Sequence, residues 1–227
     1  PATMTPLPAR ITATAGDSKS ITAKLFDVNG EWLFEYEQDP TLSSRITWSL
    51  DDEQNASLST ASGHQTYFSS EVAHRTYRAT ATYVGDTVLS QYVLIDVVPG
   101  PPAQLVVEPT PDRNASPYDA NPYGTMTITS EDTSKPAYAV LRDQYGNYIR
   151  TSKNTSWSSS DSLLVAVAAG ATDTGQGIVR RVGASGTVTV TAVDAATQFS
   201  GTLEVVVRPY YYTALDIYTT DGTNEYL

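Results

Sequence analysis

A series of short motifs occurs twice along this chain in the same order, and this internal repeat constrains the fold more than any other feature. The strongest match sets residues 23–33 (AKLFDVNGEWL) against residues 139–149 (AVLRDQYGNYI), where Ala, Leu, Asp and Gly coincide at equal spacing. Each copy predicts a strand that ends in an Asp-x-x-Gly turn, because Gly can adopt a positive φ and Asp can bond the turn backbone.

Further matches flank this one, and they keep their order in both halves of the chain. They pair residues 8–14 with 102–108, 46–49 with 155–158, 77–83 with 186–192, and 93–99 with 203–209. The third of these pairs alternates between small or aromatic residues and polar, mostly Thr, residues, which is typical of a strand with one buried and one solvated face. Repeated strands of this kind predict two modules of one fold.

A module of about 100 residues with roughly seven short strands has the size of an immunoglobulin-like domain. We therefore predict an all-β fold class, with tandem immunoglobulin-like Greek-key β-sandwiches and little helix. The residues expected to fill the first core are Ile21, Ala23, Leu25, Ile46, Trp48, Ala79, Ala81, Ile95 and Val97. The residues expected to fill the second core are Leu141, Trp157, Val188, Val190, Leu203 and Val205.

The repeat also predicts domain boundaries. The first module covers residues 1–100, and the second covers 101–209 with an inserted loop near 109–125 and an edge strand at 126–129. Residues 210–227 faintly repeat the opening strand, so we expect them to be the first strand of a truncated third module. The alternative is that they add a strand to the second module.

We expect the chain to be a fragment of a larger secreted or surface protein, because so short a last segment cannot fold alone. Residues 98–102 (VPGPP) form a Pro-dense junction, which favours a semi-rigid connection and modules that sit end to end. No apolar run approaches the roughly 20 residues that cross a bilayer. The sequence therefore predicts no membrane insertion by this chain.

Charge and cysteine content exclude several classes of protein. The chain has 25 acidic and 14 basic residues, a net charge of -11, and no Lys/Arg cluster that could form the basic face a nucleic acid needs. With no Cys, the chain has neither disulfides nor Cys-based metal centres. A Cys-free β-rich chain suits a bacterial or archaeal exported protein, so we expect an extracellular or cell-surface location.

The repeated motifs resemble those of the bacterial immunoglobulin-like (Big) modules, which occur in tandem in intimin- and invasin-type adhesins and in secreted bacterial multidomain proteins. The resemblance rests on Leu25-x-Asp27-x-x-Gly30 with Leu141-x-Asp143-x-x-Gly146, on TWS at 47–49 with SWS at 156–158, and on GTVTVTA at 186–192. It implies modules that serve as stalks, spacers or adhesive surfaces. The first module departs from the pattern because it lacks the Gly before residues 77–83, and the second departs through its insertion.

The sequence offers no catalytic constellation. Its histidines, His64 and His74, stand in polar contexts without the spacing of a zinc site. No nucleophile elbow, phosphate-binding loop or dinucleotide fingerprint is present in the sequence. We predict that the chain is not an enzyme and has no resident cofactor.

Calcium is the one metal that the sequence leaves open. Hard oxygen ligands cluster at Asp51, Asp52 and Glu53, which are the candidate calcium ligands. No complete ligand loop surrounds them, and an acidic turn after a Trp-bearing strand is usually only solvated.

Aromatic rings mark a candidate binding surface, since exposed Trp and Tyr rings commonly stack on sugars. Trp32 and Tyr36 alternate along one strand face after the first Asp-x-x-Gly turn, and Tyr118 and Tyr123 lie on the inserted loop. The alternative is that these rings cover the rim of a sandwich or pack at a module interface.

Together these features predict a non-catalytic structural, spacer or adhesive module pair of a secreted or cell-surface bacterial protein. The alternative function is that of a carbohydrate-binding accessory region of a polysaccharide-degrading enzyme. The expected partners are neighbouring modules of the same polypeptide, and a polysaccharide or a host or cell-surface protein would be the ligand of an adhesive surface.

Overall fold

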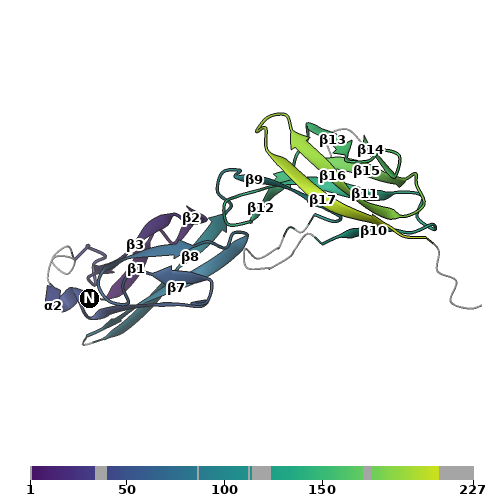
Figure 1. Ribbon diagram of the computed structural model, residues 1–227. Helices are drawn as coiled ribbons and strands as arrows, with labels where there is room; N and C mark the ends of the chain where they lie inside the picture. The colour runs from purple at the N-terminus through teal and green to yellow at the C-terminus, as the bar shows by residue number, and fades with distance from the viewer. Residues whose placement is uncertain are drawn as a thin grey trace, which may run out of the picture. The chain divides into compact units, whose positions relative to one another are not determined.

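Strands make up nearly all the regular structure of this protein. The computed structural model describes residues 2–33, 40–85, 87–111, 113, 124–170 and 175–209. Within these ranges the only α-helix is the single turn α2 (Pro40–Ser43), shown in Figure 1. No helix of the described segments is long and apolar enough to cross a membrane. The all-β prediction is confirmed.

The first sandwich consists of two four-stranded sheets with the strand orders β1-β3-β6-β5 and β2-β8-β7-β4. The strands of the first sheet are β1 (Thr3–Leu7), β3 (Ser18–Phe26), β6 (Gln65–Ser70) and β5 (Ala56–Leu58). Those of the second are β2 (Arg10–Thr14), β8 (Val88–Val98), β7 (Arg75–Val84) and β4 (Ile46–Leu50). This division of strands between sheets is that of the immunoglobulin fold, so the Greek-key prediction is confirmed.

The core of the first sandwich follows from the two-residue alternation along its strands. From Ile21 in β3 and from Tyr77 in β7, every second residue is buried, because successive side chains of a strand point to opposite faces. All nine predicted core residues are buried. Phe68 and Tyr77 extend this core, with ring centroids 5.4 Å apart.

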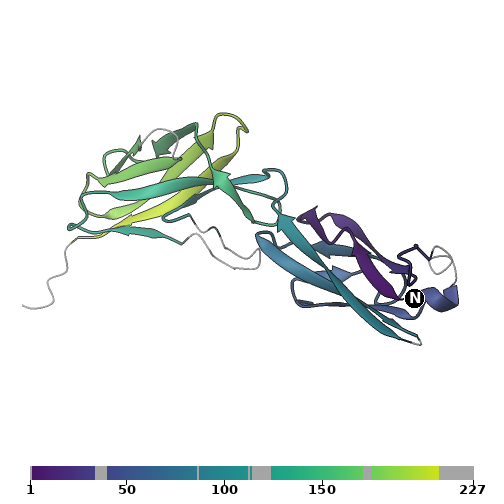
Figure 2. The same ribbon diagram turned by 180° about the vertical axis from the view of Figure 1, so that it is seen from behind.

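The second sandwich repeats this topology. One sheet has the order β10-β17-β16-β13, and the other has the order β12-β11-β15-β14 with β9 also paired to β11. Figures 1 and 2 show β16 and β17 side by side, in green to yellow. The strands of the first sheet are β10 (Met126–Ile128), β17 (Ser200–Val207), β16 (Gly186–Asp194) and β13 (Thr155–Ser159). Those of the second are β9 (Gln104–Glu108), β12 (Tyr148–Thr151), β11 (Lys135–Arg142), β15 (Gln176–Arg181) and β14 (Val165–Ala169).

Five of the predicted second-core residues are fully buried, namely Leu141, Val188, Val190, Leu203 and Val205. Trp157, the sixth predicted core residue, is only partly buried. Its ring packs against the backbone of Gly177 on β15, where an added Cβ would lie 2.7 Å from the nearest ring atoms. The lack of a side chain at Gly177 therefore makes room for the indole.

The chain forms two compact units. The first contains Pro1–Leu105 and Val140–Thr151, and the second contains Val106–Thr110 and, among the described residues, 124–139 and 152–209. The Asp-x-x-Gly turn that follows β11 thus belongs to the first unit. The predicted modules at 1–100 and 101–209 stay a prediction, and residues 210–227 lie outside the described part of the chain.

The hydrogen bonding corrects the first match of the repeat. Ala2 N donates to Phe26 O (2.7 Å) and Ala103 N donates to Arg142 O (2.9 Å), and both acceptors follow the matched Leu of the turn motif. Ala103 is therefore equivalent to Ala2, so β9 corresponds to β1. The pairing of residues 8–14 with 102–108 was wrong, because both segments read as a short strand after Pro.

The counterpart of β2 is β10. Each is a short edge strand that pairs in parallel with the last strand of its sandwich, β2 with β8 and β10 with β17. This confirms the edge strand predicted at 126–129. The predicted inserted loop near 109–125 accordingly lies between β9 and β10, and most of its residues fall outside the described part of the chain.

Candidate functional site

The two Asp-x-x-Gly turns share one internal geometry. Asp27 Oδ1 accepts hydrogen bonds from the backbone N–H groups of Asn29 and Glu31, both at 2.8 Å. Asp143 Oδ1 does the same with Tyr145 at 3.0 Å and residue 147 at 2.9 Å. Gly30 and Gly146 adopt φ values of 80° and 84°, which explains why Gly recurs at this spacing. The motif therefore encodes one rigid turn in each repeat.

These bonds stabilise the charged form of the first carboxylate. The backbone N–H of Glu31 lowers the pKa of Asp27 from its usual 3.8, and donors at Asn29 and Gly30 add to the effect. A carboxylate that accepts several N–H bonds is held in its ionised state.

The second turn is buried within the first unit. Asp143 has an exposed fraction of 0% and Asn147 one of 2%. Asp143 Oδ2 accepts from Gly100 N and from Asn147 Nδ2, both at 2.9 Å. Asn147 Nδ2 also donates to Glu71 O at 2.7 Å, and its Oδ1 accepts from Ala73 N at 3.0 Å. The amide of Asn147 thus bridges the turn and the loop between β6 and β7.

Two tyrosines extend this contact. Tyr145 packs against the hydrophobic core of the first unit, and its ring lies where a Cβ on Gly16 would be. Gly16 has a φ of 83°, so both its backbone conformation and the approaching ring call for glycine. The carbonyl of Tyr148 lies 2.6 Å from His74 Nε2. The turn is therefore held by apolar packing as well as by hydrogen bonds.

The first turn has the opposite environment. Val28 at its tip has an exposed fraction of 86%, and no heavy atom lies within 4 Å of the position that a Cβ on Gly30 would take. Beside the turn, the ammonium group of Lys24 lies 3.4 Å from the ring centroid of Trp32. One motif is thus buried in the second repeat and presented to solvent in the first.

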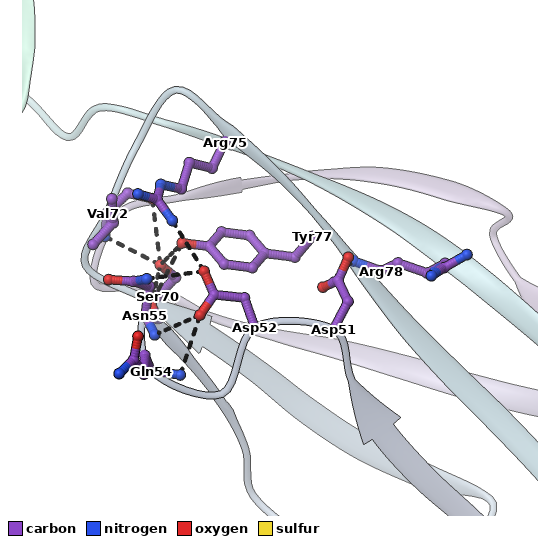
Figure 3. Close-up of polar contacts among 9 residues, drawn as sticks. All are labelled: Asp51, Asp52, Gln54, Asn55, Ser70, Val72, Arg75, Tyr77 and Arg78. Atoms are coloured by element: carbon purple, nitrogen blue, oxygen red, sulfur yellow. Dashed lines mark hydrogen bonds and ion pairs between the residues drawn. The ribbon is translucent and has the colours of Figure 1, made fainter. Parts of the chain in front are cut away.

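The acidic residues at 51–53 belong to a loop of a different kind, and Figure 3 shows two of them, Asp51 and Asp52, with their partners. Asp52 Oδ2 accepts from Asn55 Nδ2 at 2.8 Å and forms an ion pair with Arg75 at 3.0 Å. Asp51 Oδ1 accepts from Arg78 N at 2.9 Å. The Asn55 side chain, with help from Arg75, lowers the pKa of Asp52. These carboxylates tie the loop after β4 to β7.

A polar hollow of about 360 Å³ lies next to this loop, lined among others by Gln54, Asn55 and Ser57. At its edge Ser70 Oγ donates to Asn55 O at 2.7 Å and lies 3.1 Å from the hydroxyl of Tyr77. Burial raises the pKa of Tyr77. The serine and tyrosine hydroxyls bind each other and the loop backbone, so these contacts stabilise the fold of the loop.

The candidate calcium ligands are thus engaged in part by protein donors. Within the described ranges, no group of three or more His, Cys, Asp or Glu side chains is placed to hold a metal ion. A calcium site at Asp51, Asp52 and Glu53 stays a prediction.

Of the predicted aromatic surface, the structure describes Trp32, which has an exposed fraction of 40%. Tyr36, Tyr118 and Tyr123 lie outside the described residues. Because Lys24 stands over the Trp32 ring, that face of the indole is already occupied. A carbohydrate site at these four residues stays a prediction.

Sequence reasoning did not identify the buried turn as a site. Its distinguishing residues are Tyr145 and Asn147, which replace Asn29 and Glu31 of the first copy. The second turn has a large ring (Tyr145) where the first has an amide, and an amide (Asn147) where the first has a carboxylate. This difference is the only sequence signal that the second turn is buried. Its partners are mostly backbone groups, which leave no trace in a sequence.

No family model and no curated protein sequence matches this chain. Among solved structures, it is similar to domains 4–9 of the surface layer protein SbsC (16% identity, TM-score 0.37), covering 92% of this chain and 31% of that one. It is similar to human CDH23 EC21–23 (13% identity, TM-score 0.43, 95% of this chain and 70% of that one). It is also similar to InvD of Yersinia pseudotuberculosis (14% identity, TM-score 0.39, 94% and 59%). The chain spans about a third of the SbsC structure.

Proposed function

We propose that this chain is a non-catalytic structural module pair of a secreted or cell-surface bacterial protein, of the Big type that its motifs resemble. The observation that carries the proposal is the burial of the Asp143–Asn147 turn in the first unit, where Asn147 makes hydrogen bonds to Glu71, Ala73 and Asp143. A structural module needs turns that are fixed by buried hydrogen bonds of this kind.

Buried polar contacts make the position of this turn specific as well as stable. A hydrogen bond contributes only about 0.5–1.5 kcal/mol net, but a buried donor or acceptor left without its partner costs about 1–3 kcal/mol. If the turn moved away from this position, the side-chain amide of Asn147 and the backbone N–H of Ala73 would lose these hydrogen bonds. The network therefore favours the observed position of the turn over alternative positions.

The carboxylates of the first unit support a non-catalytic role. Arg10 donates to Asp96 at 2.6 and 2.8 Å, Thr76 donates to it at 2.6 Å, and the hydrogen bond from Arg10 is the main reason that the pKa of Asp96 is lowered. Asp52 is held mainly by the side chain of Asn55, with an ion pair to Arg75, and its pKa is also lowered. A carboxylate with a lowered pKa is a poor proton donor at neutral pH and also a weak proton acceptor, so it suits neither half of general acid–base catalysis. The partners expected from this role are neighbouring modules of the same polypeptide.

The proposal is tested by ¹⁵N relaxation on the full chain. If the buried hydrogen bonds fix the turn, the backbone amides of residues 143–147 will have order parameters like those of the strand amides of the first unit. Asn147→Ala should lower these order parameters, whereas Glu31→Ala, at the equivalent position of the exposed turn, should leave them unchanged. A mobile 143–147 turn in the unaltered chain would sink the proposal.

A further inference from the structure

The polar hollow beside the loop after β4 lies entirely within the first unit. Its lining comes from three segments, namely Gly16 between β2 and β3, residues 53–57 and residues 69–71. Its volume of about 360 Å³ falls within the range of roughly 300–1,000 Å³ that is typical of ligand sites. The hollow is therefore large enough to hold a small ligand.

The loop that forms one wall of the hollow is fixed by hydrogen bonds within the protein. Asp52 Oδ1 accepts from the backbone N–H groups of Gln54 and Asn55 at 3.2 and 3.3 Å, and Asp52 Oδ2 accepts from Asn55 Nδ2 at 2.8 Å. Ser70 Oγ, on β6, donates to Asn55 O at 2.7 Å (Figure 3). Because these contacts already hold the wall in place, a ligand would not have to order it on binding.

Several side chains that line the hollow are available to a ligand. Neither Glu53 nor Gln54 has a side-chain hydrogen bond or ion pair with another described residue. Ser57 Oγ and Ser69 Oγ lie 3.0 Å apart, so one hydroxyl donates to the other and the pair keeps one donor and further acceptor positions. The hollow thus offers a carboxylate, an amide and two hydroxyls, which together donate and accept hydrogen bonds.

An exposed aromatic ring lies beside these groups. The residues of β6 alternate between its two faces, so Tyr67 and Ser69 share the outer face. The two residues are about 7 Å apart along the strand, and Tyr67 has an exposed fraction of 45%. A ring next to hydroxyl, amide and carboxylate groups suits a sugar, because the sugar carbons can pack on the ring while the sugar hydroxyls bind the polar groups.

We propose that the Tyr67 ring and the adjacent hollow form a binding site for a neutral hexose oligosaccharide. Charge disfavours an acidic sugar or a phosphate, since Glu53 and Glu71 line the hollow and no Lys or Arg is among the described residues that line it. A cationic side chain only donates hydrogen bonds, so it would use the carboxylates and leave the acceptor-and-donor set of Gln54 and the serines unmatched. The site adds an adhesive function to the structural role of the module.

The test is a titration of the ¹⁵N-labelled full chain with maltohexaose, cellohexaose and mannohexaose, each to about 10 mM, which detects dissociation constants of about 1 mM. We expect the amides of residues 53–57 and 67–71 to shift with at least one of these sugars. No shift at these amides with any of them would overturn the proposal. Shifts with hexalysine alone would overturn it in favour of a cationic ligand.

Variants assign the binding to these groups. Tyr67→Ala should weaken it about tenfold, whereas Tyr67→Phe, which keeps the ring, should change it by less than about twofold. Gln54→Ala should weaken it roughly 2- to 10-fold, through the loss of a hydrogen bond. Tyr92→Ala, at an exposed ring on the other sheet of this sandwich, is the matched control and should bind like the unaltered chain.

Two outcomes of this series would refute the site, namely equal losses in the Tyr67→Ala and Tyr92→Ala variants, or full binding by both Tyr67→Ala and Gln54→Ala. The relaxation experiment on the 143–147 turn measures a different part of the first unit and needs no sugar. The structural proposal and the binding site therefore fail separately.

Discussion

Asn147 Nδ2 donates a hydrogen bond of 2.7 Å to the carbonyl oxygen of Glu71, although 76 residues separate them in the chain. The same side chain accepts from Ala73 N. Asn147→Ala removes both hydrogen bonds and takes away the acceptor of the buried Ala73 N, so we expect it to lower the free energy of unfolding by about 1–3 kcal/mol. Urea denaturation measures this change. Glu31→Ala, in the exposed turn, should change it by less than about 0.5 kcal/mol. Equal losses of stability in the two variants would contradict a stabilising role of the Asn147 hydrogen bonds.

Two glycines with nearly the same backbone conformation offer a second test. Gly16 and Gly30 have φ values of 83° and 80°, but only Gly16 faces a protein ring, that of Tyr145. Replacing either by Ala should cost roughly 1–2 kcal/mol for the left-handed conformation. Gly16→Ala should cost about 1–3 kcal/mol more through overpacking. Thermal unfolding of both variants gives the difference, and in a Tyr145→Ala background that difference should disappear.

Low pH should destabilise the loop after β4, which the Asp52 carboxylate holds through Asn55 and Arg75. The pKa of Asp52 is lowered from 3.8 by the hydrogen bond from Asn55, so its contribution to stability is fully present above pH 3.8 and is lost as pH falls through the lower, folded-state value. Asp52→Asn removes the titrating group. The difference in unfolding free energy between the two proteins should be constant near neutral pH and shrink below pH 3.8. A difference that grows in acid would refute this reading of the carboxylate.

Trp32 tests the alternative of carbohydrate binding. Because the ammonium of Lys24 lies 3.4 Å from its ring centroid, one face of the ring is occupied by protein. We expect Trp32→Ala to leave retention on insoluble-polysaccharide affinity gels unchanged. Tyr92→Ala, at another exposed ring that faces a cation, serves as the control. A selective loss of retention in the Trp32 variant would favour the carbohydrate-binding function.

Much of the fold could be predicted from the sequence, because the period of two along strands such as β7 and β16 is a local property. The Asp-x-x-Gly turn could also be predicted from the sequence, since one Asp and one Gly suffice to specify it. The equivalence of β9 with β1 was missed, as the opening strand of each sandwich is split into two short pieces with similar patterns. The partial exposure of Trp157 could not be predicted, because the glycine that accommodates its ring lies on another strand.

The candidate site was less predictable than the fold. Asp143 and Asp27 stand in matching motifs, yet one is buried and the other is near the surface. The difference arises from contacts with Gly100 N, Glu71 O and Ala73 N, which are main-chain groups present at almost every residue. Only the choice of Tyr145 and Asn147 within the turn distinguished the two copies.

The parallel pairing of β2 with β8 has a mechanical consequence. Residues Arg10–Thr14 lie in register with Leu94–Val98, so the first and last strands of this sheet run in the same direction. A pulling force applied to the two ends of the domain acts along these strands in opposite senses and loads their hydrogen bonds in shear, all at once. In the second sandwich the corresponding pairing is shorter, covering Met126–Ile128. Under tension, the second sandwich should therefore yield before the first.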